Sequence, residues 1–205
     1  MDMISSRTVG RIVITSVTYL VLVFIAMHFL EPEFDPIRAP GSAYVLGAYG
    51  SLMTTSYFAW CVAWLAVGYG LLATVRGTCL TRIACVVALI ACAGILLAAS
   101  FPMDYPPPLR TTSGRLHALG GGLAFPGMIL ASSLFSLSIR QDGEWKRVAG
   151  LVSGLSVGIV AAFVLTISSM LVLGFGGYAQ RVLMACLSTW MIVIGLHLTR
   201  RPRSA

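Results

Sequence analysis

The chain has 205 residues, of which 58% are hydrophobic and only 10% are charged. Soluble domains of this length carry more charge and less apolar sequence, so the composition excludes a soluble globular protein and indicates that lipid surrounds most of the chain. The net charge of +7 does not indicate nucleic-acid binding, because that function needs a basic patch on a folded soluble surface.

A helix needs roughly 20 apolar residues to cross the hydrocarbon layer of a membrane. Six stretches meet this length, at about 11–30, 50–75, 83–101, 116–138, 148–173 and 180–199. We therefore expect an all-α integral membrane protein, with residues 1–205 forming one bundle of six transmembrane helices. The first stretch is longer than the apolar region of a signal peptide and lacks a small-x-small cleavage site, so we expect it to stay attached.

The cations predict the orientation of the bundle. Six spans place both termini on one side, and that side holds ten of the fourteen cations: Arg7, Arg11, Arg76, Arg82, Arg140, Lys146, Arg147, Arg200, Arg201 and Arg203. The other side holds Arg38, Arg110, Arg115 and Arg181. Since short cytoplasmic loops collect Lys and Arg, we expect both termini in the cytoplasm and the protein in the cytoplasmic (inner) membrane, with membrane lipids as partners.

The first outer loop, residues 31–41, holds three prolines, which favour an extended and restrained backbone. Residues 42–50 are apolar but interrupted by glycine, and predict either a short helix or the outer end of the second span. Ser42 precedes this apolar run and is predicted to cap it. Tyr44 is suited to anchoring at the interface or to packing.

The second outer loop runs from Phe101 to His117 and is the strongest candidate for chemistry. Three consecutive prolines at 106–108 fix φ and remove backbone donors, so the loop is stiff. It carries ionisable side chains between two apolar spans, namely Asp104, Arg110, Arg115 and His117. A rigid polar loop at the end of a span predicts a site at the outer face of the membrane.

Two features concern packing. The third span is rich in Ala, Cys and Gly, which allow neighbouring backbones to approach closely. The fifth span has Gly150, Gly154 and Gly158 at four-residue spacing, so they share one helix face. We expect this face to pack against another helix of the same chain, and a contact with a second copy is the alternative. The five cysteines lie in spans or on the cytoplasmic side, so we expect no disulfide.

Three stretches together resemble domain of unknown function 998, a family of six-span bacterial and archaeal membrane proteins. They are residues 28–44 continuing into 47–53, then Phe101-Pro-Met-Asp104 with Thr112-x-Gly114-x-Leu-His117, and finally residues 177–181. The family often has an acid between the serine and tyrosine of its Ser-x-Tyr element, where this chain has Ala43. The resemblance implies the six-span fold and transfers no activity, because a shared fold does not supply a function.

Two functions from different classes are consistent with the outer residues. In the first, Asp104 and His117 form the acid/base pair of an enzyme that acts on a lipid-like or other membrane-borne substrate, since a carboxylate can orient an imidazole and raise its basicity. Arg115 and Arg181 would then hold an anionic headgroup. The remaining candidates for substrate binding are Arg110, Ser42, Tyr44, Glu31 and Asp35.

In the second, the protein is a non-catalytic module that binds lipid or another ligand, or a transporter-like subunit. Asp104 would then pair with an outer arginine and hold the loop in place. We assign no metal and no cofactor. His28, His117 and Asp104 are the weak candidates for metal ligands, with His28 and His117 as axial ligands in a haem alternative, but no ligand spacing joins any two of them.

Overall fold

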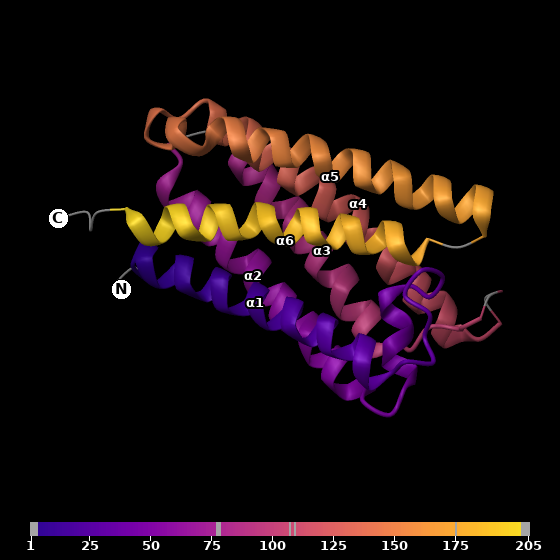
Figure 1. The fold of residues 1–205 in the computed structure, drawn as a ribbon. Coiled ribbons are helices and arrows are strands. Elements are labelled where there is room, and N and C mark those ends of the chain that lie inside the picture. The colour runs from indigo at the N-terminus through magenta and orange to yellow at the C-terminus, as the bar shows by residue number, and fades with distance from the viewer. Residues whose placement is uncertain (1–3, 77–78, 107, 109, 175, 202–205) are drawn as a thin grey trace.

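The computed structural model describes residues 4–76, 79–106, 108, 110–174 and 176–201. Within these residues the chain forms six long helices and two short 3₁₀ helices (Figure 1). They are α1 (Ser6–Leu30), η1 (Gly41–Leu46), α2 (Gly50–Thr74), α3 (Cys79–Ser100), α4 (Thr112–Arg140), η2 (Gly143–Trp145), α5 (Lys146–Leu173) and α6 (Gly177–Arg200).

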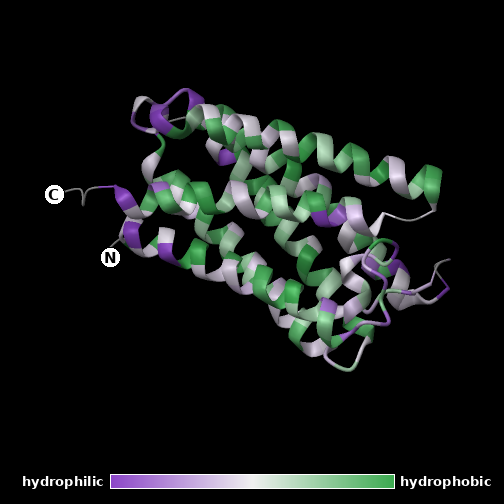
Figure 2. Cartoon of the chain, in the orientation of Figure 1, coloured by the Kyte–Doolittle hydropathy of each residue, from purple (hydrophilic) through white to green (hydrophobic). Residues whose placement is uncertain are grey.

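All six long helices are long and apolar enough to cross a membrane, which confirms the expected all-α integral membrane fold. The helical form follows from the solvent, because lipid offers no hydrogen-bond partners and each apolar run must pair its backbone groups within itself. Figure 2 shows hydrophobic residues along the helices, with hydrophilic residues mostly gathered at the two ends of the bundle. Arg203 and Pro107, which entered the predictions above, lie outside the described residues.

Local signals mark several helix ends. The Ser5 hydroxyl accepts the backbone N–H of Thr8 and caps α1, and the Thr111 hydroxyl accepts the N–H of Gly114 and caps α4. Helix α5 ends at Gly174, whose φ of 70° lies in the left-handed region that glycine adopts without strain. Residues 42–50 do not simply extend α2, because η1 forms a separate short helix before it.

The helices form a closed ring in chain order. Each helix packs against the next, and α1 also packs against α6, so the first and last helices are neighbours. Both chain termini therefore lie at one end of the bundle, here called the termini end (Figure 1). The opposite end holds η1, the α3–α4 loop and the start of α6, and is called the η1 end.

Aromatic side chains fill the middle of the ring. Trp64 of α2 stacks on Trp190 of α6 with ring centroids 5.8 Å apart, and Phe135 of α4 stacks on the same indole at 6.3 Å. The Trp190 indole N–H donates to the Ser136 hydroxyl at 3.0 Å. This bond satisfies a polar group that is otherwise enclosed by apolar side chains.

Glycine permits a close approach of the backbones of α3 and α4. A Cβ added at Gly94 would lie 2.6 Å from the backbone nitrogen of Ala124, and one at Gly120 would lie 2.6 Å from that of Ala98. These small residues let the two backbones touch, as the composition of the third span predicted. Helices α3 and α4 also share the most extensive contact of any helix pair.

The glycines of the fifth span, Gly150, Gly154 and Gly158, do not pack against another helix of the same chain, so that prediction is wrong. A Cβ added at any of the three would meet no atom within 4 Å, so the strip faces away from the other helices. Helix α5 is peripheral, since only 22% of its most apolar 18-residue segment is buried, compared with 56% of the corresponding segment in α4. Four-residue spacing shows that the glycines share a face, but not what the face contacts. The contact with a second copy stays a prediction.

Candidate functional site

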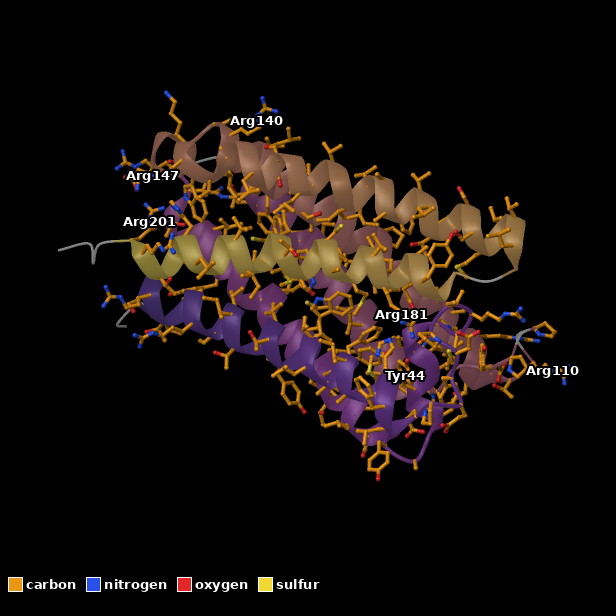
Figure 3. All side chains as sticks on the ribbon, viewed as in Figure 1. Tyr44, Arg110, Arg140, Arg147, Arg181 and Arg201 are labelled. Carbon is orange, nitrogen blue, oxygen red and sulfur yellow. The ribbon has the colours of Figure 1, made fainter. Side chains whose placement is uncertain are left out.

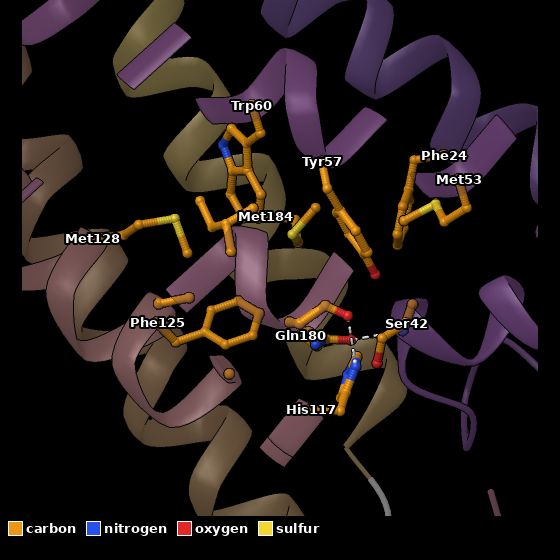
Figure 4. A pocket seen from close by; sticks show the side chains of 15 residues that line it. Phe24, Ser42, Met53, Tyr57, Trp60, His117, Phe125, Met128, Gln180 and Met184 are labelled. Atoms are coloured by element: carbon orange, nitrogen blue, oxygen red, sulfur yellow. Dashed lines mark hydrogen bonds between the residues drawn. The ribbon is translucent and has the colours of Figure 1, made fainter. Parts of the chain in front are cut away.

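A small cavity of about 50 Å³ lies at the η1 end, between α1, η1, α2, α3, α4 and α6. Most of its walls are apolar, and they include Phe24, Met53, Trp60, Phe125, Met128 and Met184. Figure 4 shows four polar side chains on one side of this space, where the Tyr57 hydroxyl points toward Ser42, Gln180 and His117. An apolar cavity with a few convergent polar groups is the usual form of a binding site for a small molecule.

His117 is held by the end of the neighbouring helix. Its Nδ1 lies 3.0 Å from the carbonyl oxygen of Ala98 and 2.9 Å from that of Phe101. A helix leaves its last carbonyls without partners, so the end of α3 supplies these acceptors. Because a carbonyl only accepts, Nδ1 carries the proton in this arrangement. The neutral ring then has its lone pair on Nε2, which makes His117 able to accept a proton or a hydrogen bond.

The other polar groups of the cavity are partly engaged. The Gln180 Oε1 accepts the backbone N–H of Gly41 at 2.7 Å, which ties α6 to η1. The Ser42 hydroxyl donates to the Met103 sulfur at 3.1 Å, so Ser42 links η1 to the α3–α4 loop. Ser42 is not the cap that its position suggested, since Pro40 occupies the N-cap of η1. Among the described residues, the buried indole N–H of Trp60 has no hydrogen-bond partner.

Arg181, at the start of α6, uses its guanidinium to join three segments. Its Nε–H donates to His28 Nε2 at 2.9 Å, and its terminal nitrogens donate to the Ala39 carbonyl at 2.9 Å and the Tyr44 hydroxyl at 3.0 Å. It also donates to the Gly177 carbonyl and lies 5.5 Å from the centroid of the Phe24 ring. Figure 3 shows Arg181 and Tyr44 together inside the η1 end.

The bonds of His28 explain its orientation. Its Nε2 accepts from Arg181, and its Nδ1 donates to the Phe24 carbonyl at 2.7 Å. Both ring nitrogens are therefore engaged by the protein, and neither points to a site for a ligand. Arg181 likewise directs four hydrogen bonds inward, so it differs from the headgroup-binding arginine that the sequence predicted.

Glu31 is buried, with 1% of its surface exposed, and accepts the backbone N–H of Tyr49 just before α2. A Cβ at Gly47 would overlap this carboxylate, so the glycine makes room for it. Asp35 is exposed; it accepts the N–H of Ile37 at 2.9 Å and lies 3.9 Å from Arg38. Both acids thus organise the segment between α1 and α2, and neither lines the cavity.

Asp104 holds the start of α4. Its carboxylate accepts the backbone N–H groups of Arg110 at 2.6 Å and Thr111 at 2.8 Å, and the Thr111 hydroxyl at 2.7 Å. These donors precede the first turn of α4, where backbone N–H groups lack helical partners and attract negative charge. Among the described residues no ion pair includes Asp104. Its hydrogen bonds go to the loop, not to His117.

Replacing Asp104 with alanine should lower the melting temperature at neutral pH, and the loss should shrink in acid. Hydrogen bonds from Thr111 and then Arg110 favour the charged form and hold the pKa of Asp104 below its usual value of 3.8. A carboxylate with a lowered pKa stabilises the fold above its unfolded pKa, and this contribution is lost as the pH falls through the folded pKa. The difference between wild type and Asp104→Ala should be constant above about pH 5 and decrease below about pH 4.

Thermal melts of both proteins in one detergent over this pH range measure the effect. Glu33→Ala, at an exposed carboxylate of the loop between α1 and η1, is the control and should show little difference at any pH. A deficit for Asp104→Ala that is unchanged at about pH 3 would mean that the charge of Asp104 does not stabilise the loop.

The structure thus divides the predicted site residues into groups. His117 and Ser42 line the cavity, whereas Arg181, Tyr44 and His28 form an internal cluster beside it. Arg110 and Arg115 are exposed, and Figure 3 shows Arg110 pointing away from the bundle. Among the described residues, no three His, Cys, Asp or Glu side chains form a group that could hold a metal ion.

Sequence reasoning did not assign the cavity residues that carry further polar groups, namely Tyr57, Trp60 and Gln180. Tyr57 and Trp60 resemble ordinary aromatic residues of a span, and nothing in the sequence indicates which face of α2 points inward. Gln180 carried a usable signal, because an uncharged amide next to Arg181 in the first turn of a span is an additional polar group at the interface.

Comparison with known proteins agrees with this architecture. No curated protein and no solved structure matches the chain. The family described as "Protein of unknown function (DUF998)" matches residues 13–197, which cover all or most of every membrane helix. The resemblance inferred from three stretches of the sequence is therefore confirmed, and the chain belongs to the DUF998 family of proteins.

Proposed function

We propose that this integral membrane protein binds a lipid-like, membrane-borne ligand in the cavity at the η1 end. One observation carries the proposal: His117, oriented by the end of α3, meets Tyr57, Ser42 and Gln180 on one side of a space whose other walls are apolar. A ligand with a polar group attached to an apolar body matches both parts of this lining.

The cavity walls support a ligand larger than the present volume. A space of about 50 Å³ holds a few waters or one small chemical group. Three of the lining residues are the methionines Met53, Met128 and Met184, whose unbranched side chains adapt their shape readily. We infer that the end of an amphiphile enters between them, while Arg110 and Arg115 meet an anionic headgroup at the membrane surface. Asp104 then serves to hold the loop that carries Arg110.

We further propose that the η1 end faces the outside and the termini end faces the cytoplasm of the inner membrane, from the distribution of cations. A single cysteine placed at the exposed position Pro106 should react with an impermeant maleimide added to intact cells, in a background without the native cysteines. A cysteine at the exposed position Gly143 should react only after the cells are opened. The reverse pattern would place the cavity on the cytoplasmic side.

Filling the cavity should block the ligand. Gly121 lines the cavity, and a Cβ there would meet no atom within 4 Å, so Gly121→Leu projects a side chain from the wall without displacing backbone. In vesicles that contain a diazirine-labelled phospholipid, wild-type protein should be cross-linked at cavity residues such as Trp60 and Met128. We expect Gly121→Leu to reduce this labelling severalfold.

Gly122→Leu is the matched control, because Gly122 is equally open but does not line the cavity. Its labelling should equal that of the wild type. Labelling confined to lipid-facing positions in the wild type, or equal losses in the two variants, would contradict ligand binding in this cavity.

The acid/base enzyme is the second candidate, and the orientation of His117 favours it specifically. With Nδ1 donating to carbonyls, Nε2 is the basic atom available to a bound substrate. Backbone carbonyls of α3 would perform the orienting role that the sequence assigned to Asp104. His117→Gln separates the two functions. If the protein is an enzyme, the wild type alters the lipid composition of the vesicles, and the variant is still cross-linked but no longer alters it. If the protein only binds, neither the wild type nor the variant alters the lipid composition.

A further inference from the structure

At the opposite end of the molecule, an open groove of about 870 Å³ lies between the start of α5 and the end of α6. Four cationic side chains line it: Lys146, Arg147, Arg200 and Arg201. Figure 3 shows Arg147 of α5 and Arg201, directly after α6, at this end of the bundle. The groove and the cavity described above lie at opposite ends of the helix bundle and share no lining residue.

The positive charge of the groove is largely uncompensated. Glu144 is the one carboxylate in the lining, and it already pairs with Arg76 at 3.2 Å and with Arg201. Among the described residues, no ion pair includes Lys146, Arg147 or Arg200. Three cations that gather at one groove without acidic partners repel each other, and an anion between them would relieve that repulsion.

The floor of the groove indicates what kind of anion it takes. Its remaining lining includes Val148 and Leu151 from α5 and Val193 and Leu196 from α6. Leu151 and Leu196 are 56% and 40% exposed, so they form a surface that an acyl chain can cover. Since these residues follow the cations inward along both helices, the lining changes from charged to apolar in the direction of the membrane core.

An aromatic pair, the buried Trp145 and the half-buried His197, fixes the geometry of the two helix ends. The Trp145 ring lies 4.2 Å from the His197 ring, measured between centroids, and Arg201 lies 5.7 Å from the Trp145 centroid. These contacts hold the start of α5 against the end of α6 and so fix the cations on both sides of the groove. Because contacts within the protein hold the cations in place, the ordering cost of binding is lowered.

We propose that this groove is a binding site for an anionic phospholipid, with the phosphate between Lys146, Arg147 and Arg200 and an acyl chain against Leu151 and Leu196. A free phosphate would use the cations alone and leave the apolar floor uncovered. A phospholipid uses both parts, and it is present at high concentration at the level of the membrane where the groove opens.

The test uses the full-length protein in detergent and titrates it with phosphatidylglycerol, with native mass spectrometry as the readout. Lys146→Gln/Arg147→Gln/Arg200→Gln removes the three cations. Each cation near the membrane surface raises the affinity for an anionic lipid about fivefold, so removing three should lower the affinity for phosphatidylglycerol at least about tenfold. The matched control is Arg7→Gln/Arg11→Gln/Arg140→Gln, which removes three exposed cations from the same end but outside the groove.

Two further measurements separate a lipid from a free anion. Leu196→Trp covers the apolar floor and should weaken phosphatidylglycerol severalfold without removing charge, and millimolar inorganic phosphate should not displace the lipid. Phosphatidylcholine, which carries no net charge, should bind weakly to all variants. If the groove triple variant unfolds, Arg200→Gln alone gives the same comparison against Arg140→Gln.

Equal losses in the groove and control variants would overturn the proposal, because they would show only general attraction to a basic surface. Full competition by inorganic phosphate together with no effect of Leu196→Trp would assign the groove to a free anion instead. Because all these substitutions lie at the termini end, the outcome is independent of ligand binding near His117.

Discussion

Arg181→Met should lower the free energy of unfolding by about 1–3 kcal/mol or more, because removing the guanidinium leaves several acceptors without their donor. The guanidinium donates to His28, to the Tyr44 hydroxyl and to two backbone carbonyls. Without it, these acceptors remain enclosed and lose their donor, and leaving buried polar groups unsatisfied costs more than the net value of a typical hydrogen bond.

Arg181→Lys should recover only part of the loss. An ammonium group keeps the charge but cannot reproduce the planar fork that reaches His28, Ala39 and Tyr44 at once. Thermal unfolding in one detergent, followed by circular dichroism, compares these variants with Arg115→Met. Arg115 is exposed at the start of α4, so its loss should change the melting temperature little.

A double-mutant comparison identifies the network itself. Tyr44→Phe removes only the hydroxyl that accepts from Arg181, so its effect should be smaller in the Arg181→Met background than in the wild type. If Arg181→Met and Arg115→Met have the same melting temperature, the hydrogen bonds of the Arg181 guanidinium do not stabilise the η1 end in detergent.

Gly94→Ala should be strongly destabilising for a substitution that adds only one methyl group. The added Cβ would lie 2.6 Å from the Ala124 nitrogen and 2.7 Å from the Gly120 carbonyl oxygen, and both are backbone atoms that cannot rotate away. Helices α3 and α4 must separate to admit it. We expect a loss of about 1–3 kcal/mol or more, as for other overpacked sites.

Gly154→Ala is the matched control for the same chemical change. A Cβ at Gly154 meets nothing within 4 Å, so the variant should melt at the wild-type temperature or slightly above it. Melting temperatures of the two variants in detergent and in lipid give the comparison. Equal stability of the two proteins would mean that the close approach of α3 and α4 does not persist in the membrane.

The two glycine positions also show what the sequence could and could not predict. The six spans were predictable, because lipid requires internal hydrogen bonding and the apolar runs have the length of the hydrocarbon layer. Which face of a span points inward was not, because both lipid and a membrane-protein core are apolar. For this reason Gly154 was assigned to an internal contact, and Tyr57 and Trp60 were not assigned to a site.

In the polar loop between α3 and α4, the position of the segment was predictable but the hydrogen-bond partners of Asp104 were not. The sequence placed the segment from Asp104 to His117 at one end of the bundle, where the structure also has it, but an inventory of side chains suggested arginines as partners of Asp104. Its actual partners are mostly backbone N–H groups, which every residue except proline carries. The beginning of a helix at Thr112 was the available signal, since helix starts leave such donors free.

The closed ring of helices has a consequence for the order in which the protein is made. His28, Ala39 and Tyr44 emerge from the ribosome early, yet their shared donor, Arg181, belongs to the last helix to be synthesised. Gly10 of α1 packs against Gly195 of α6, so this face of α1 stays uncovered until α6 has been synthesised. A nascent chain that stops before α6 therefore lacks one wall of the bundle and the donor that anchors the segment between α1 and α2.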